Sequence, residues 1–89
     1  MTPSDHMSEV AAIGCVICLE YLGVRTPAEI HHIAEGSGKR SDYAVAGLCP
    51  AHHRQGGASI HGMGSKAFLR LWKLPSEYWL LVLVNKYRG

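Results

Sequence analysis

The segment Cys49-Pro50-Ala51-His52-His53, residues 49–53, combines a cysteine with two adjacent histidines at the start of an expected helix. The two-residue gap between Cys49 and His52 repeats the gap in Cys15-Val16-Ile17-Cys18 earlier in the chain. Such gaps let one turn of chain present both members of a ligand pair, and structural zinc takes four cysteine or histidine ligands in a tetrahedron. We therefore expect Cys15, Cys18, Cys49 and His52 to hold a structural Zn²⁺ that joins these two parts of the chain.

The length and cysteine count agree with this expectation. The 89 residues suffice for one small domain, residues 1–89, and exclude large multi-domain enzyme architectures. The 47% apolar content fits a folded protein. So short a chain buries only a small core, however, and often needs additional stabilisation, for example by a bound metal ion. Three cysteines cannot all pair as disulfides, and no signal segment precedes them, so we expect a reducing, cytoplasmic setting that favours metal binding. A redox pair at Cys15 and Cys18, or a chance spacing of buried cysteines, is the alternative.

The expected elements are those of an α+β domain. Residues 1–7 are polar and are expected to be disordered, and a short helix is expected from Ser8 toward Cys15. Apolar segments 29–33 and 43–48 flank a turn-rich stretch, 36–42, and predict a β-hairpin with a long basic loop. Helices are expected over 50–54, 65–72 and 77–86. The last segment is also rich in strand formers, but we favour a helix. Its apolar run, 79–84, is far below the roughly 20 residues of a membrane span, so no membrane partner is expected.

Four histidines need a further explanation once the zinc site has taken His52; they are His31, His32, His53 and His61. Any one of them could be an ordinary buried histidine. Together they favour a catalytic divalent-metal site, where a cation neutralises a phosphate and a free imidazole deprotonates water. Strand alternation over 29–33 places His31 and His32 on opposite faces.

The net charge of +2 hides an uneven distribution. Residues 1–35 hold one basic and five acidic residues, whereas residues 36–76 hold six basic residues and one acidic residue. Clustered Lys and Arg favour a phosphate-bearing partner through counterion release, although solvated basic faces are common.

The order of these motifs resembles the HNH endonucleases of the ββα-metal fold, especially small phage and prophage members and the nuclease domain of the phage recombination-enhancement, RecA-dependent nuclease. The resemblance spans about residues 13 to 73. The residues that carry it are Cys15–Cys18, Glu29–Ile33, Ser41-Asp42, Leu48–His53 and His61. It implies a hairpin and short helix stapled by the structural zinc, with flanking helices.

The resemblance also implies roles for the histidines. His32 falls on the general base, His31 and His53 fall on ligands of a catalytic divalent ion (Mg²⁺, Mn²⁺, Ni²⁺ or Zn²⁺), and His61 is the candidate that completes the set. One site can receive both His31 and His32 only if the strand bends or ends there. Many relatives orient the base with an Asn, which this chain lacks between His32 and His53; Asp42 or a backbone carbonyl is the candidate replacement.

The implied activity is metal-dependent hydrolysis of DNA phosphodiester bonds with little sequence specificity. Lys39, Arg40, Arg54 and Lys66 are the expected phosphate contacts, each of which could instead be simply solvated. Two alternatives stay open. One is a non-catalytic zinc-stapled module that binds nucleic acid or protein. The other is a prophage accessory protein that cuts only with a partner such as a recombinase filament.

Overall fold

The structure is a computed structural model that describes residues 2–33 and 41–88. At its centre is an antiparallel hairpin of β1 (Glu29–His32) and β2 (Val45–Leu48), in which Glu29 lies opposite Leu48 and His32 opposite Val45. All four residues of β2 are buried. The predicted hairpin is thus confirmed, whereas most of its basic loop, with Lys39 and Arg40, lies outside the described residues.

Helix α1 (Pro3–Ile13) corrects the expected N-terminus. Residues 3–7, expected to be disordered, form the first turns of this helix, which was expected to begin only at Ser8. The reason is a capping box: Thr2 Oγ1 accepts from the Asp5 N–H at 3.1 Å, and the Asp5 carboxylate accepts from the Thr2 N–H at 3.3 Å. Pro3 at the first helical position strengthens the start.

The remaining helices are short, and two of them lie where no helix was expected. A π-helix, η1 (Cys18–Leu22), follows the first cysteine pair, in a connection that was expected to be irregular. Helix α2 (Pro50–His53) carries the adjacent histidines, and α4 (Ser65–Trp72) matches its expected range. Helix α3 (Ile60–Met63) was not expected, because its residues followed a glycine-rich break; Ser59 Oγ caps it by accepting from the Gly62 N–H at 2.9 Å.

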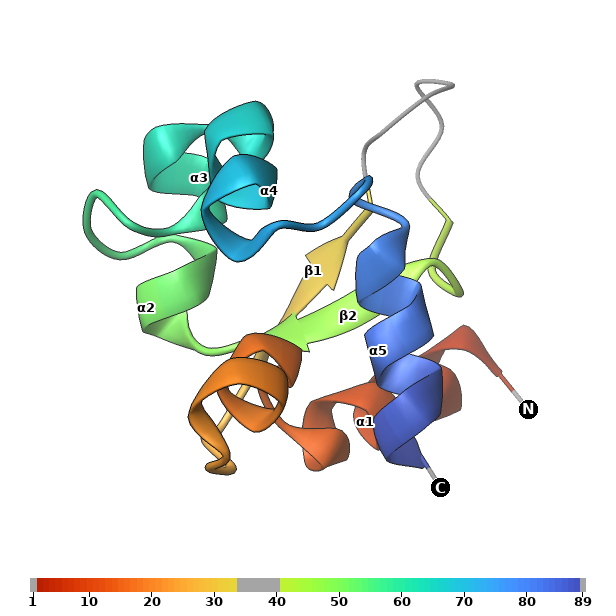
Figure 1. Ribbon diagram of the computed structural model, residues 1–89. Coiled ribbons are helices and arrows are strands. Elements are labelled where there is room, and N and C mark those ends of the chain that lie inside the picture. Colours follow the sequence, from red (N-terminus) through yellow and green to blue (C-terminus); the bar gives the residue numbers. More distant parts are fainter. Residues whose placement is uncertain (1, 34–40, 89) are drawn as a thin grey trace.

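Helix α5 (Trp79–Arg88) settles the choice between helix and strand for the last segment. It buries Leu80, Leu83 and Val84, a helical spacing, against β2 and α1. Figure 1 shows α1 and α5 beside the hairpin, with α2, α3 and α4 grouped at its other side. Among the described residues, no helix is long and apolar enough to cross a membrane.

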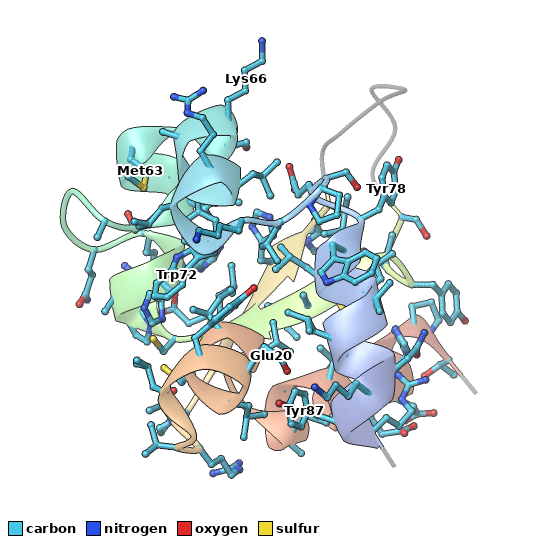
Figure 2. All side chains as sticks on the ribbon, viewed as in Figure 1. Glu20, Met63, Lys66, Trp72, Tyr78 and Tyr87 are labelled. Atoms are coloured by element: carbon cyan, nitrogen blue, oxygen red, sulfur yellow. The ribbon has the colours of Figure 1, made fainter. Side chains whose placement is uncertain are left out.

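The core lies between these two groups of helices. Its largest fully buried side chains come from six separate segments and include Val10, Ile17, Leu48, Ile60, Phe68 and Leu80. Trp72, labelled in Figure 2, packs perpendicular to the His52 ring with the ring centroids 5.4 Å apart. The apolar core therefore reaches the histidines and holds the segments that carry them.

Candidate functional site

The first cluster consists of Cys15, Cys18, Cys49 and His52, named here the Cys3His cluster. Their ligand atoms all lie within 4.8 Å of one another, and the three cysteines are buried. The Nδ1 atom of His52 is 3.6 Å from Cys15 Sγ, 3.6 Å from Cys18 Sγ and 3.2 Å from Cys49 Sγ. The structure thus brings together the four residues that the spacing predicted.

Local backbone geometry explains why these side chains meet. The Cys18 N–H points to Cys15 Sγ at 3.5 Å, so the first pair closes a tight turn. Cys49 is the N-cap residue of α2, and the His52 and His53 N–H groups both donate to its carbonyl. The second pair is therefore presented by the first turn of a helix that Pro50 begins.

The chemistry of the Cys3His cluster fits a soft metal ion such as zinc. Three thiols and one imidazole form a recognised structural zinc set. Burial raises the pKa of Cys15 to about 12, so this thiol keeps its proton when no cation is present. The hydroxyl of Thr26 is buried without a hydrogen-bond partner among the described residues. A buried hydroxyl of this kind is suited to donate to a metal-bound thiolate.

The second cluster consists of His31, His53 and His61, named here the trihistidine cluster. Their ligand atoms also lie within 4.8 Å of one another. The ring centroids are 5.3 Å apart for His31 and His53, 5.4 Å for His31 and His61, and 4.8 Å for His53 and His61. The three rings come from β1, α2 and α3, so α3 brings His61 back to His53 across the glycine-rich turn. Three imidazoles that converge in this way could hold a divalent cation.

Two of these histidines are held by carboxylates that the sequence analysis did not assign. Glu77 accepts from His31 Nε2 at 2.9 Å, and Glu29 accepts from His53 Nδ1 at 2.9 Å. Burial lowers the pKa of His31, although Glu77 acts in the opposite direction. Hydrogen bonds from Arg54 and His53 lower the pKa of Glu29 to about 2. Neither contact follows from a local motif, because each joins distant parts of the chain.

His32 has different surroundings from His31. It is partly exposed, and its Nε2 lies 2.9 Å from Asp42 Oδ1. Although alternation separates the two side chains, both line one cavity of about 470 Å³, together with His53, His61 and Glu77. Strand β1 ends at His32, which is the condition under which both histidines can reach one site.

The expected phosphate contacts do not gather at this cavity in the described part of the chain. Arg54 forms a bidentate pair with Glu29, with an Nη2–Oε2 distance of 2.6 Å and an Nε–Oε1 distance of 2.9 Å. Lys66 is exposed and projects from α4 toward solvent in Figure 2. Its neighbour Ser65 lines the cavity, which places the start of α4 at the rim.

Comparison with known proteins supplies the family. No curated protein and no solved structure matches the chain. A family model described as "Recombination enhancement, RecA-dependent nuclease" matches residues 3–75, a range that contains every member of both clusters and also His32. Since this match covers well over half of the chain, the protein belongs to the family of recombination enhancement, RecA-dependent nucleases.

Proposed function

We propose that this protein is a divalent-metal-dependent DNA endonuclease of the HNH, ββα-metal type, derived from a phage or prophage. The family supports a nuclease that acts in recombination. The observation that carries the finer proposal is one cavity lined by the trihistidine cluster and by a fourth histidine, His32, that stands apart from it. Metal-assisted hydrolysis requires metal ligands and a separate general base at the same cavity.

His32 is the proposed general base. Asp42 accepts from its Nε2–H, so Nδ1 is the unprotonated ring nitrogen, the one that can take a proton from water. An imidazole oriented by a carboxylate is a common arrangement for a base, because the carboxylate fixes the tautomer and stabilises the imidazolium that forms. Asp42 therefore takes the role expected of an Asn in relatives.

The trihistidine cluster is the proposed site of the catalytic cation. When bound, a divalent ion there supplies electrostatic stabilisation of the charge that develops on the phosphate. His31 and His53 are fixed by Glu77 and Glu29, so their rings are already oriented before substrate arrives. Zinc in the Cys3His cluster has the separate role of holding α2 against the chain before β1.

The proposed substrate is the DNA backbone, with little selection among base sequences. Arg54, directly after α2, and Lys66, in α4, are exposed, and Lys39 and Arg40 lie in the sequence between the two strands. Lysine and arginine contacts to phosphates position a strand without reading its bases. The family description makes a RecA-type recombinase the proposed partner.

The test is nicking of supercoiled plasmid by the purified protein, with and without a RecA filament, across added Mg²⁺, Mn²⁺ and Ni²⁺ and with chelator. We expect cleavage that depends on metal and is reduced about 10²–10⁴-fold in His32→Ala, while tightly bound zinc is retained. Undiminished cleavage by His32→Ala would refute the assignment of the base. Binding of DNA without cleavage under any of these conditions would favour a zinc-stapled binding module.

A further inference from the structure

The contact between Glu77 and His31 joins the trihistidine cluster to a part of the chain beyond the matched range. Glu77 precedes α5, whereas the family model ends at residue 75. Figure 1 shows the segment between α4 and α5 running past the end of β1, where His31 lies. Both partners are almost completely buried, with 3% of Glu77 and 4% of His31 exposed. A buried carboxylate requires a compensating polar partner, and His31 supplies one.

Hydrogen-bond chemistry determines which ring nitrogens remain available. A carboxylate oxygen accepts, so the nitrogen that faces it must carry the proton. Glu77 faces Nε2 of His31, which leaves the Nδ1 lone pair of that ring free. Glu29 faces Nδ1 of His53, which leaves the Nε2 lone pair of that ring free. The two rings therefore offer a metal different nitrogen atoms, Nδ1 from His31 and Nε2 from His53.

We propose that Glu77 and Glu29 are positioning residues of the trihistidine cluster, which select Nδ1 of His31 and Nε2 of His53 as the atoms that bind the cation. This inference rests on the metal centre of the proposed function and adds to it a specific choice of atoms. Histidine ligands commonly donate their second N–H to a carboxylate, which fixes the ring and raises its basicity. Here that support comes from two segments far apart in the sequence, β1 and the segment before α5.

The two carboxylates differ in how easily water could replace them as hydrogen-bond acceptors for the histidines. Glu77 is buried, so water cannot replace it as an acceptor for His31. Glu29 is 29% exposed and shares its oxygens with Arg54, which lies on its solvent side. Loss of Glu29 can be compensated in part by water, whereas loss of Glu77 cannot. Glu77 is therefore expected to have the larger effect on metal affinity.

The experiment is a Co²⁺ titration of the full chain, in which the two clusters have separate signals. Thiolate-to-cobalt absorption reports filling of the Cys3His cluster, and the weaker visible bands that follow report the trihistidine cluster. We expect Glu77→Gln to weaken the second binding step about 10–100-fold and Glu29→Gln to weaken it less, with the first step unchanged. Glu20→Gln is the matched control, because Glu20 also accepts hydrogen bonds but from Lys86 and Tyr87.

A second measurement needs no variant and so does not depend on whether Glu77→Gln folds. Long-range ¹H–¹⁵N correlation spectra of the zinc-loaded wild-type protein identify the protonated nitrogen of each ring. We expect His31 to carry its proton on Nε2 and His53 on Nδ1. Metal bound through Nε2 of His31, or an unchanged second affinity in Glu77→Gln, would overturn the inference while leaving the nuclease proposal intact. A wild-type protein that takes up no second Co²⁺ would overturn the metal centre itself, and the inference with it.

Discussion

His52 and His53 are consecutive residues of α2, yet they belong to different clusters. His52 Nδ1 lies 3.2 Å from Cys49 Sγ, whereas the His53 ring lies 4.8 Å from the His61 ring. Adjacent residues on a helix point about 100° apart, so one turn of α2 can serve two sites on different sides. This short helix is the physical link between the expected structural ion and the proposed reaction centre.

Substituting these two histidines separately should affect different properties, the stability of the fold for His52 and the cleavage activity for His53. His52→Ala should release zinc and unfold the domain, because binding of a structural zinc contributes about 10–16 kcal/mol in zinc-finger peptides. His53→Ala should keep zinc and the fold but lose metal-dependent cleavage. Zinc content by mass spectrometry, thermal melting and plasmid nicking check both variants. Equal loss of zinc from both would contradict the division into two clusters.

The contact of Asp42 with His32 predicts a measurable role in the rate. Asp42→Asn should slow cleavage, although by less than the roughly 10²–10⁴-fold loss expected for His32→Ala, because the amide still orients the ring without stabilising its charge. Ser41→Ala is the control, since Ser41 Oγ accepts a local hydrogen bond from the Tyr43 N–H. Single-turnover rates compare the three variants, and a wild-type rate in Asp42→Asn would exclude this role.

Gly62 determines where α3 can lie. A Cβ atom at residue 62 would collide with the Gly56 carbonyl oxygen and lie 2.6 Å from Ser59 Oγ. Gly62→Ala should therefore displace α3 and His61, with a cost of about 1–3 kcal/mol. Binding of the second Co²⁺ should weaken, while the Cys3His cluster still fills. Gly57→Ala is the matched control, because a Cβ there meets no atom within 4 Å, and it should leave both melting and metal binding unchanged.

The contact between Glu20 and α5 predicts a difference in acid stability. Hydrogen bonds from Lys86 and Tyr87 lower the pKa of Glu20 below its usual 4.5, and Figure 2 shows Glu20 beside Tyr87. Because the pKa is lower in the folded protein, the stabilisation is complete above the unfolded-state pKa and is lost as the pH falls through the folded-state pKa. As the pH falls below 4.5, the wild type should lose stability more steeply than Glu20→Gln. Urea denaturation at a series of pH values measures how the free energy of unfolding of each protein depends on pH. Equal pH dependence in the two proteins would disprove the contribution of Glu20.

Filling the Cys3His cluster should release protons. Burial raises the pKa of Cys15 to about 12, so zinc must displace a proton from this thiol at neutral pH. Zinc affinity should therefore increase as the pH rises. Calorimetry of the metal-free protein in two buffers with different ionisation enthalpies counts the protons, and we expect at least one. A binding heat that does not depend on the buffer would show that Cys15 is not a ligand.

The sequence alone determined the features that are local in the chain. Two-residue spacings predicted the four members of the Cys3His cluster, and Pro50 predicted the start of α2. Apolar patterning predicted both strands, α4 and the helical state of the C-terminal segment. These predictions depend on one or two turns of chain, whose geometry is set by neighbouring residues. The N-terminal helix was missed over residues 3–7 because the polar composition outweighed the cap that Thr2 and Asp5 form.

The contacts that support the trihistidine cluster could be found only in the tertiary structure. His31 and Glu77 are 46 positions apart, and His53 and Glu29 are 24 apart, so no spacing rule connects them. Glu77 reaches His31 because α5 packs its apolar face on β2 and carries the preceding segment to the end of β1. Likewise, α3 folds back only because glycine at residue 62 allows the close approach to Gly56. Burial of apolar surface, which no local motif records, is the force that brings these groups into one cavity.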